Sequence, residues 1–151
     1  MPGSGAGRSL ITSRPAATSF KETLVTYPAS SPQPPRDALA GTLKRTEIQH
    51  RPSSIPGREI VQVLTEIPAG VESGWHTHPG EEVGYIVAGT VEMAIYGRAT
   101  LTLRAGDGFL IPPRTPHNAR DLGPGTGHML STYIVETGQP LASLTGKPDD
   151  R

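Results

Sequence analysis

The chain has 151 residues, and its 14 Lys+Arg balance its 14 Asp+Glu, so the formal net charge is zero. This balance argues against a nucleic-acid partner, because binding to a phosphate backbone depends on excess positive charge. The absence of cysteine excludes disulfides, thiolate nucleophiles, iron–sulfur clusters and thiolate zinc sites. No stretch approaches the roughly 20 consecutive apolar residues of a membrane helix, and the N-terminus lacks the apolar segment of a secretory signal. We therefore expect a cytoplasmic protein with no membrane partner.

Residues 1–40 are predicted to form an extended N-terminal arm. They contain six prolines and many small polar residues, and the segment PASSPQPPRD at 28–37 is typical of a polyproline-like connector. Such a composition favours disorder. The alternative is that the arm pairs as an extra strand or crosses to a second subunit, with residues 10–28 as the edge or exchanged strand.

From Gly41 onward the sequence changes to short apolar and β-branched runs separated by Gly and Pro turns. The 18 glycines and 16 prolines are poor material for long helices, and only residues 37–43 carry a weak helical pattern. The expected strands cover residues 42–48, 59–67, 75–78, 83–87, 91–96, 100–103, 109–111, 117–120 and 128–136. This spacing predicts an all-β sandwich or small barrel over residues 41–138, followed by a C-terminal tail at 139–151.

Four side chains that favour metal binding lie in two separate parts of this β region. His76 and His78 stand at i and i+2, so in an extended chain both imidazoles point to one face, with Cα atoms about 6.5 Å apart. Glu82 follows after Pro79-Gly80, a pair that can bend the chain and return a carboxylate toward the same interior. His117 comes from a later strand. Each signal alone is weak, because strand histidines also occur in half-exposed positions without a metal.

The two parts together resemble the two motifs of the cupin superfamily. The segment Gly70-x5-His76-x-His78-x3-Glu82-x6-Gly89 agrees with the first motif at every position. The segment Gly106-x5-Pro112-x-Arg114-x2-His117 agrees with the second motif at its glycine, proline and histidine. Arg114 stands where the family pattern has glycine, and Asp121 where it has asparagine, so the turn geometry and the charge at the barrel mouth are open. The resemblance covers residues 58–136.

The resemblance implies a double-stranded β-helix, or jelly-roll barrel, in which His76, His78, Glu82 and His117 ligate one divalent metal. Three neutral imidazoles and one carboxylate suit Fe, Mn, Ni, Co, Cu or Zn better than Ca or Mg, and iron is the metal we expect first. Four protein ligands on an octahedral ion leave two positions for water, dioxygen or a bidentate substrate. Small cupins often pair, so the resemblance also implies a homodimer.

Strand alternation assigns the neighbouring residues to faces. Glu82 shares the face of Ile86, so Glu82 rather than Glu81 is predicted to point inward, and Glu81 is expected at the rim. Trp75 alternates with His76 and is expected on the opposite face of the strand, and Tyr85 likewise points away from the interior.

The substrate pocket is predicted less directly. Gly84 lies on the inner face beside Glu82 and is a candidate for leaving room for a ligand, with packing alone as the alternative. Arg114 is a candidate for binding a carboxylate at the mouth, with a solvated turn as the alternative. The expected apolar wall favours a small organic substrate over a highly charged one. His50 and His128 lie outside both motifs and are expected to be ordinary strand or surface histidines.

Three functions fit this site. The first is a metal-dependent dioxygenase for a small phenolic, diketone or similar bidentate substrate, with Glu82 as a ligand that can loosen and act as a base. The second is a non-redox metal-dependent cyclase, isomerase or lyase, in which the metal polarises a carbonyl. The third is a non-catalytic small-molecule or metal-binding module. By family analogy we expect the dioxygenase first.

Overall fold

A computed structural model of the chain describes residues 37–149, which form ten strands and one short 3-10 helix. The predicted arm, including the candidate strand at 10–28, lies outside the described residues except for residues 37–40. No helix in residues 37–149 is long and apolar enough to cross a membrane. The elements in chain order are η1 (Ala38–Gly41), β1 (Lys44–Pro52), β2 (Arg58–Ile67), β3 (His76–Thr77), β4 (Gly80–Ala88), β5 (Thr90–Ile95), β6 (Leu101–Arg104), β7 (Gly108–Ile111), β8 (His117–Asp121), β9 (Gly127–Glu136) and β10 (Ser143–Leu144).

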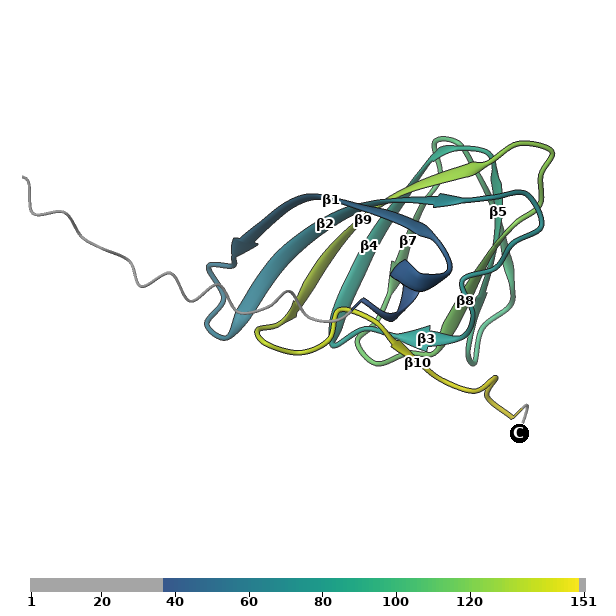
Figure 1. The fold of residues 1–151 in the computed structure, drawn as a ribbon. Coiled ribbons are helices and arrows are strands. Elements are labelled where there is room, and N and C mark those ends of the chain that lie inside the picture. Colours follow the sequence, from purple (N-terminus) through teal and green to yellow (C-terminus); the bar gives the residue numbers. More distant parts are fainter. Residues whose placement is uncertain (1–36, 150–151) are drawn as a thin grey trace, which may run out of the picture. The chain divides into compact units, whose positions relative to one another are not determined.

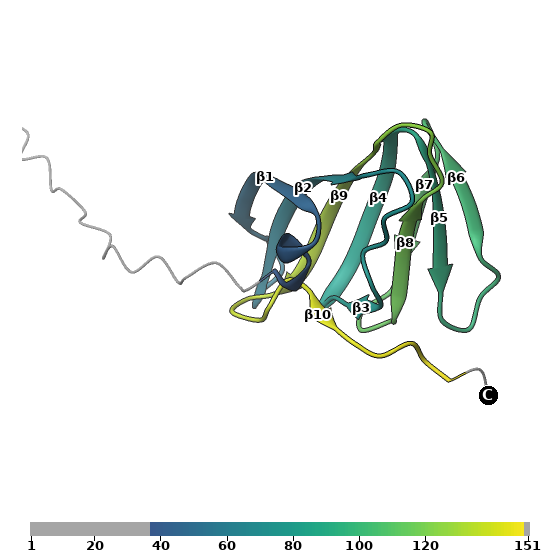
Figure 2. The same cartoon turned by 45° about the vertical axis from the view of Figure 1, so that its right-hand side comes forward.

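The strands form two five-stranded antiparallel sheets, in the orders β1-β2-β9-β4-β7 and β10-β3-β8-β5-β6. Figure 1 shows how the chain passes repeatedly from one sheet to the other, which encloses a shared interior. The view in Figure 2 places η1 at the end of the barrel where it contacts β1 and β10. This architecture confirms the predicted all-β fold, a double-stranded β-helix or jelly-roll barrel.

Alternation of side chains along the strands builds the interior. β2 and β9 alternate between buried and half-buried positions over their whole length, because successive strand residues point to opposite faces. Each fully buried aliphatic side chain contributes roughly 1.5–3 kcal/mol by leaving water, so the barrel rests mainly on this shared core. The main core cluster consists of Leu43, Ile67, Ile86, Val91, Met93, Ile95, Leu103, Phe109, Ile111, Ala119 and Met129.

Both ends of the described segment add packed structure beyond the predicted strands. β1 begins at Lys44 and continues to Pro52, later than the expected strand at 42–48, because pairing with β2 keeps its polar second half extended. η1 lies within the weak helical pattern of residues 37–43, and its N-cap Asp37 accepts a hydrogen bond from the Leu39 N–H at 3.1 Å. The predicted C-terminal tail contains a strand, β10, which pairs with β3. A two-residue edge strand carries no periodic pattern, so the sequence did not indicate it.

Candidate metal centre

Three buried histidines meet inside the barrel. His76 lies on β3, His78 follows directly after this strand, and His117 begins β8, where it stands opposite His76 in the antiparallel pair. The ring centroids lie 4.9 Å (His76–His78), 4.1 Å (His76–His117) and 5.0 Å (His78–His117) apart. One ring nitrogen of each histidine lies within 4.8 Å of the others. This three-histidine cluster has the spacing to hold a metal ion.

Glu82 brings a carboxylate to the cluster from the other sheet. It lies on β4 and is 2% exposed, and its Oε2 is 3.1 Å from both His78 Nε2 and His117 Nε2. The adjacent Glu81 points outward, and its Oε2 lies 4.0 Å from Arg58 Nη1. Glu82 thus faces inward and Glu81 outward, as strand alternation predicts, and the structure brings the side chains of the four predicted ligands together.

Hydrogen bonds to the main chain fix the tautomer of each imidazole. A carbonyl oxygen can only accept, so the ring nitrogen that contacts it carries the proton. In each neutral ring Nδ1 is that donor, and the lone pair remains on Nε2, which is the form that ligates metals. The acceptors for His76, His78 and His117 are, in that order, the carbonyls of Gly74 at 2.7 Å, Leu141 at 2.7 Å and Thr115 at 2.9 Å.

The Nε2 lone pairs of His78 and His117 are placed to bind a cation. His78 Nε2 is buried and makes no hydrogen bond within residues 37–149, although Glu82 Oε2 lies 3.1 Å away. His117 Nε2 faces the same oxygen at 3.1 Å. With the proton on Nδ1, both nitrogens and the carboxylate oxygen are acceptors, and acceptors crowded in a buried pocket are stabilised by a positive charge between them. The donor set therefore fits a divalent transition metal.

Burial and neighbouring charges set the protonation states. Burial, followed by the adjacent His117 and His78, lowers the pKa of His76 to about 3, so this imidazole is uncharged at neutral pH. Burial alone would raise the pKa of Glu82, but His78 and His117, when they carry a proton on Nε2, outweigh that effect and hold this pKa well below its usual range. A neutral imidazole and a carboxylate anion are the forms that bind metals.

Two further polar side chains reach the site, and the sequence analysis missed both. Tyr133 on β9 stands opposite Glu82 in the β4–β9 register, and its hydroxyl donates to Glu82 Oε1 at 3.1 Å. Arg45 on β1 donates from Nη1 to the Tyr133 hydroxyl at 3.1 Å. Alternation along β9 puts Tyr133 on the same inward face as the apolar Val135, a signal that could have found it. β1 has no apolar alternation, so nothing in its pattern marks Arg45 as buried.

Within residues 37–149, the two residues predicted for substrate binding make other contacts. A Cβ at Gly84 would lie 2.0 Å from the Phe109 ring, so this glycine permits close packing and leaves no space for a substrate. The Arg114 side chain is exposed, and its Nη2 donates to Glu136 Oε1 at 2.9 Å on the surface. Arg114 has a φ of 56°, the left-handed conformation that favours glycine, which accounts for the glycine of the family pattern.

A small cavity adjoins the three-histidine cluster. Its volume of about 10 Å³ corresponds to about one water molecule. The lining combines the predicted apolar wall with the guanidinium of Arg45, which the sequence pattern did not indicate. The lining residues are Leu39, Leu43, Arg45, Thr65, Ser73, His76, Glu82, Met93, His117, Ala119, Met129 and Tyr133.

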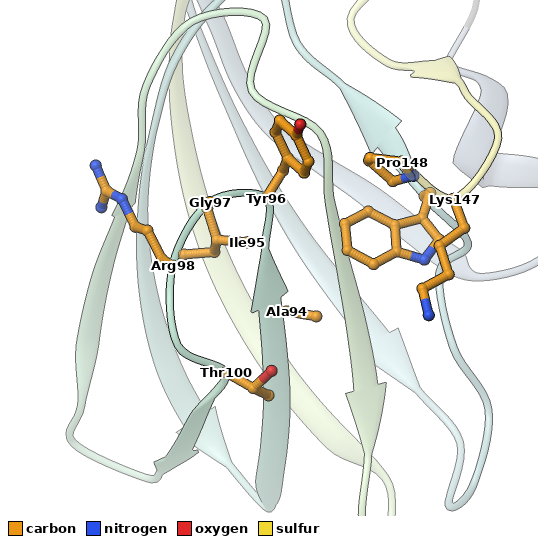
Figure 3. A pocket seen from close by; sticks show the side chains of 9 residues that line it. Ala94, Ile95, Tyr96, Gly97, Arg98, Thr100, Lys147 and Pro148 are labelled. Carbon is orange, nitrogen blue, oxygen red and sulfur yellow. The ribbon is translucent and has the colours of Figure 1, made fainter. Parts of the chain in front are cut away.

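A larger groove lies outside the barrel, along β5. It has a volume of about 460 Å³, and Figure 3 shows Tyr96, Arg98 and Lys147 among its lining residues. Trp75 also lines this groove, which agrees with its predicted position on the face opposite His76. None of the described residues that line the groove is a histidine, so the groove is separate from the candidate metal centre.

The sequence matches a known domain family. The family model described as a cupin domain matches residues 63–133, a range that includes His76, His78, Glu82, His117 and Tyr133. No curated protein matches the chain.

Solved structures of similar fold come from several organisms. The DMSP lyase DddQ from Ruegeria pomeroyi is 23% identical with a TM-score of 0.58, and the match covers 68% of this chain and 51% of that one. A double-stranded β-helix protein from Klebsiella pneumoniae is 21% identical with a TM-score of 0.58, covering 71% and 87%. A variant of Bacillus subtilis oxalate decarboxylase is 20% identical with a TM-score of 0.51, covering 56% and 23%. The chain thus spans about half the length of the DMSP lyase, and at these identities the likeness concerns the fold alone. The domain match, the two histidine motifs and the two-sheet barrel together show that the chain belongs to the cupin superfamily.

Proposed function

We propose that this protein is a metal-dependent enzyme that acts on a small organic substrate, with one divalent transition metal held by His76, His78, His117 and Glu82. The observation that carries this proposal is the buried convergence of three imidazoles and one carboxylate, with every Nδ1 already engaged by a carbonyl. Three nitrogen ligands and one oxygen ligand suit Fe, Mn, Ni, Co, Cu or Zn. Iron is the metal we propose first.

Residues around the proposed metal ligands orient Glu82 and form the apolar part of the cavity wall. A bound metal of this kind supplies Lewis acidity, and iron also supplies redox chemistry. The Tyr133 hydroxyl holds Oε1 of Glu82, which leaves Oε2 facing the imidazoles. Met93 and Met129 make part of the cavity wall apolar, and an apolar wall strengthens the electrostatic interactions of the groups inside.

A dioxygenase is one form of this proposal. It rests on the cupin resemblance and on a ligand set that leaves coordination positions for a bidentate phenol or diketone. In this form Glu82 is the ligand that can loosen and act as a base. Iron or another redox-active metal is required.

A non-redox lyase, isomerase or cyclase is the other form, and Tyr133 favours it. Burial, followed by the charge of Glu82, raises the pKa of the Tyr133 hydroxyl, so the phenol keeps its proton at neutral pH. This hydroxyl lies on the cavity wall, 3.1 Å from Glu82 Oε1. A phenol that keeps its proton can donate a hydrogen bond to a substrate oxygen that gains negative charge, and such stabilisation serves non-redox bond making and breaking. A fold shared with enzymes named as a lyase and a decarboxylase accommodates such chemistry.

Metal analysis combined with oxygen uptake tests the proposal. The full chain is purified without added metal, reconstituted separately with Fe(II) and Zn(II), and assayed with phenolic, diketone and small carboxylic-acid substrates. Substrate-dependent oxygen uptake with iron supports the dioxygenase, whereas turnover without oxygen uptake supports the non-redox enzyme. Metal retention without any turnover indicates the non-catalytic binding module. A chain that retains no transition metal contradicts the proposal altogether.

The homodimer is a proposal that rests on the resemblance. Sedimentation of the full chain checks it, and a mass of one chain rather than two contradicts it.

A further inference from the structure

Arg45 is buried without a complete set of partners. Its side chain is 3% exposed, and its Nε donates to Asp37 Oδ2 at 2.8 Å. Nη1 donates to Thr65 Oγ1 at 2.8 Å and to the Tyr133 hydroxyl at 3.1 Å. Nη2 is also buried and has no hydrogen-bond partner among residues 37–149. A guanidinium can donate five hydrogen bonds, and a charged donor left unpaired in the interior is strongly destabilising, so Nη2 favours an additional acceptor.

The Arg45 guanidinium and the candidate metal centre share one cavity. Arg45 lines this cavity together with His76, His117, Glu82 and Tyr133. The Tyr133 hydroxyl stands between Arg45 and Glu82, at 3.1 Å from a polar atom of each. A molecule that enters the cavity can therefore contact the guanidinium and the metal ligands at the same time.

The charges around the cavity favour a single negative charge on such a molecule. Asp37 and Glu82 are the two carboxylates hydrogen-bonded to this network. With a divalent metal at the three-histidine cluster, the positive charges of the metal and Arg45 exceed those two carboxylates by one. An unbalanced charge in a dry interior is costly, so a monoanion is the favoured occupant.

We propose that Arg45 binds the carboxylate group of the substrate, which makes the substrate a small organic monocarboxylate. The proposal rests on the proposed function, because the metal contributes to the charge balance. Carboxylates are the preferred partners of guanidinium groups, whose N–H fork matches the two oxygens. The anion accepts a hydrogen bond from Nη2 and lies within reach of the Tyr133 hydroxyl, the proposed hydrogen-bond donor.

Under this proposal the cavity must widen to admit the substrate, and η1 is the side that is tied to Arg45 itself. The cavity of about 10 Å³ holds about one water molecule, so a carboxylic acid requires more space. Leu39 of η1 lines the cavity, and Asp37, the N-cap of η1, is tied to Arg45 by an ion pair of 2.8 Å. A carboxylate on Nη2 shares the positive charge of Arg45 with Asp37 on Nε, and so weakens the contact that holds η1 in place.

Acetate binding to the zinc-loaded full chain tests the proposal, with acetamide as the neutral molecule of the same shape. Calorimetry compares the wild type with Arg45→Met, Arg45→Lys and the exposed control Arg104→Met, after the zinc content of each protein has been measured. We expect the wild type to bind acetate in preference to acetamide. Arg45→Met should weaken acetate binding by about tenfold or more, Arg45→Lys by less, and Arg104→Met should leave it unchanged.

The outcomes separate this proposal from the proposed function. A wild-type chain that retains no zinc contradicts the proposed function. Equal acetate affinity in zinc-loaded wild type and Arg45→Met overturns the role of Arg45 alone, because the anion is then bound by the metal only and water satisfies Nη2. If Arg45→Met does not fold, Asp37→Asn decides: removing the competing carboxylate should tighten acetate binding several-fold, and an unchanged or weaker affinity overturns the proposal.

Discussion

Tyr133 and Glu82 stand opposite each other in the β4–β9 pair, and the Tyr133 hydroxyl donates to Glu82 Oε1 at 3.1 Å. The second carboxylate oxygen, Oε2, is thereby left to face His78 and His117. Tyr133 is 0% exposed and Glu82 is 2% exposed, so water does not replace this hydrogen bond. The orientation of the carboxylate therefore depends on a residue outside the three-histidine cluster.

Replacing this tyrosine is expected to weaken metal binding without unfolding the barrel. Tyr133→Phe removes only the hydroxyl, so Glu82 loses the partner that fixes its orientation. Loss of such an orienting group lowers metal affinity by about 10–100-fold, which competition with a chelator of known affinity measures. Tyr85→Phe, at an exposed position on the outer face of β4, is the matched control and should bind metal like the wild type. Equal affinity in both variants would show that Glu82 is held by other contacts.

The histidine ligands are tested by truncation. His76→Ala and His117→Ala each remove one nitrogen donor, so neither variant should retain metal after dialysis, while far-ultraviolet circular dichroism should still report a folded β protein. Folding is expected to persist because the main core cluster contains neither residue. His128→Ala removes a histidine outside the cluster and should keep its metal. Full occupancy in His76→Ala or His117→Ala is incompatible with the assigned ligand set.

The strands and the convergence of the three histidines with Glu82 were predictable because their signals are local in the sequence. The alternation of β2 and β9 follows from the period of two of a strand, and the same period separates Glu82 from Glu81. The spacing of His76, His78 and Glu82 reflects one strand, one bend and the next strand. His117 was found through its motif, which reproduces the pairing of β3 with β8.

The residues that surround the predicted ligands were not predictable, because their positions depend on contacts between residues that are distant in the sequence. Arg45 is buried by partners 20 and 88 residues away, Thr65 and Tyr133, and its own strand is otherwise polar and largely exposed. Gly84 was assigned to the correct face, but the side chain that fills the space beside it, Phe109, comes from another strand. Alternation along a strand shows which side chains point inward. It does not show which side chain from another strand packs against them, because that depends on the three-dimensional packing.

The metal-free protein is expected to lose stability as the pH falls from 6.5 toward 4.5. The pKa of His76 is about 3 in the folded protein against 6.5 for the ordinary imidazole, so in this range the unfolded chain binds a proton that the folded chain excludes. The free energy of unfolding therefore decreases as the pH decreases, and is fully retained above 6.5. Below pH 4.5 Glu82 also lowers the free energy of unfolding as the pH falls, because its pKa in the folded protein lies well below its ordinary value of 4.5.

Thermal unfolding across this pH range checks the effect of His76. The Tm of the wild type, measured in the presence of a chelator, should fall with decreasing pH, and the fall should be smaller in His76→Gln, which lacks the titrating ring. A Tm profile that is identical in His76→Gln and wild type would assign the acid sensitivity to other groups.

Gly84→Ala distinguishes a packing role for this glycine from a role in making room for substrate. A Cβ at this position would lie 2.0 Å from the Phe109 ring, and Phe109 belongs to the buried core cluster, so the ring cannot move into solvent. Overpacking of this kind should lower the free energy of unfolding by roughly 1–3 kcal/mol, measured as a lower urea midpoint. Gly125→Ala is the control, because a Cβ there meets no atom within 4 Å.

The double variant Gly84→Ala with Phe109→Leu should regain part of the lost free energy of unfolding, because leucine is smaller than the opposing phenylalanine. If Gly84→Ala is instead as stable as the wild type, the Phe109 ring has space to withdraw, and the inner face beside Glu82 can open for a ligand.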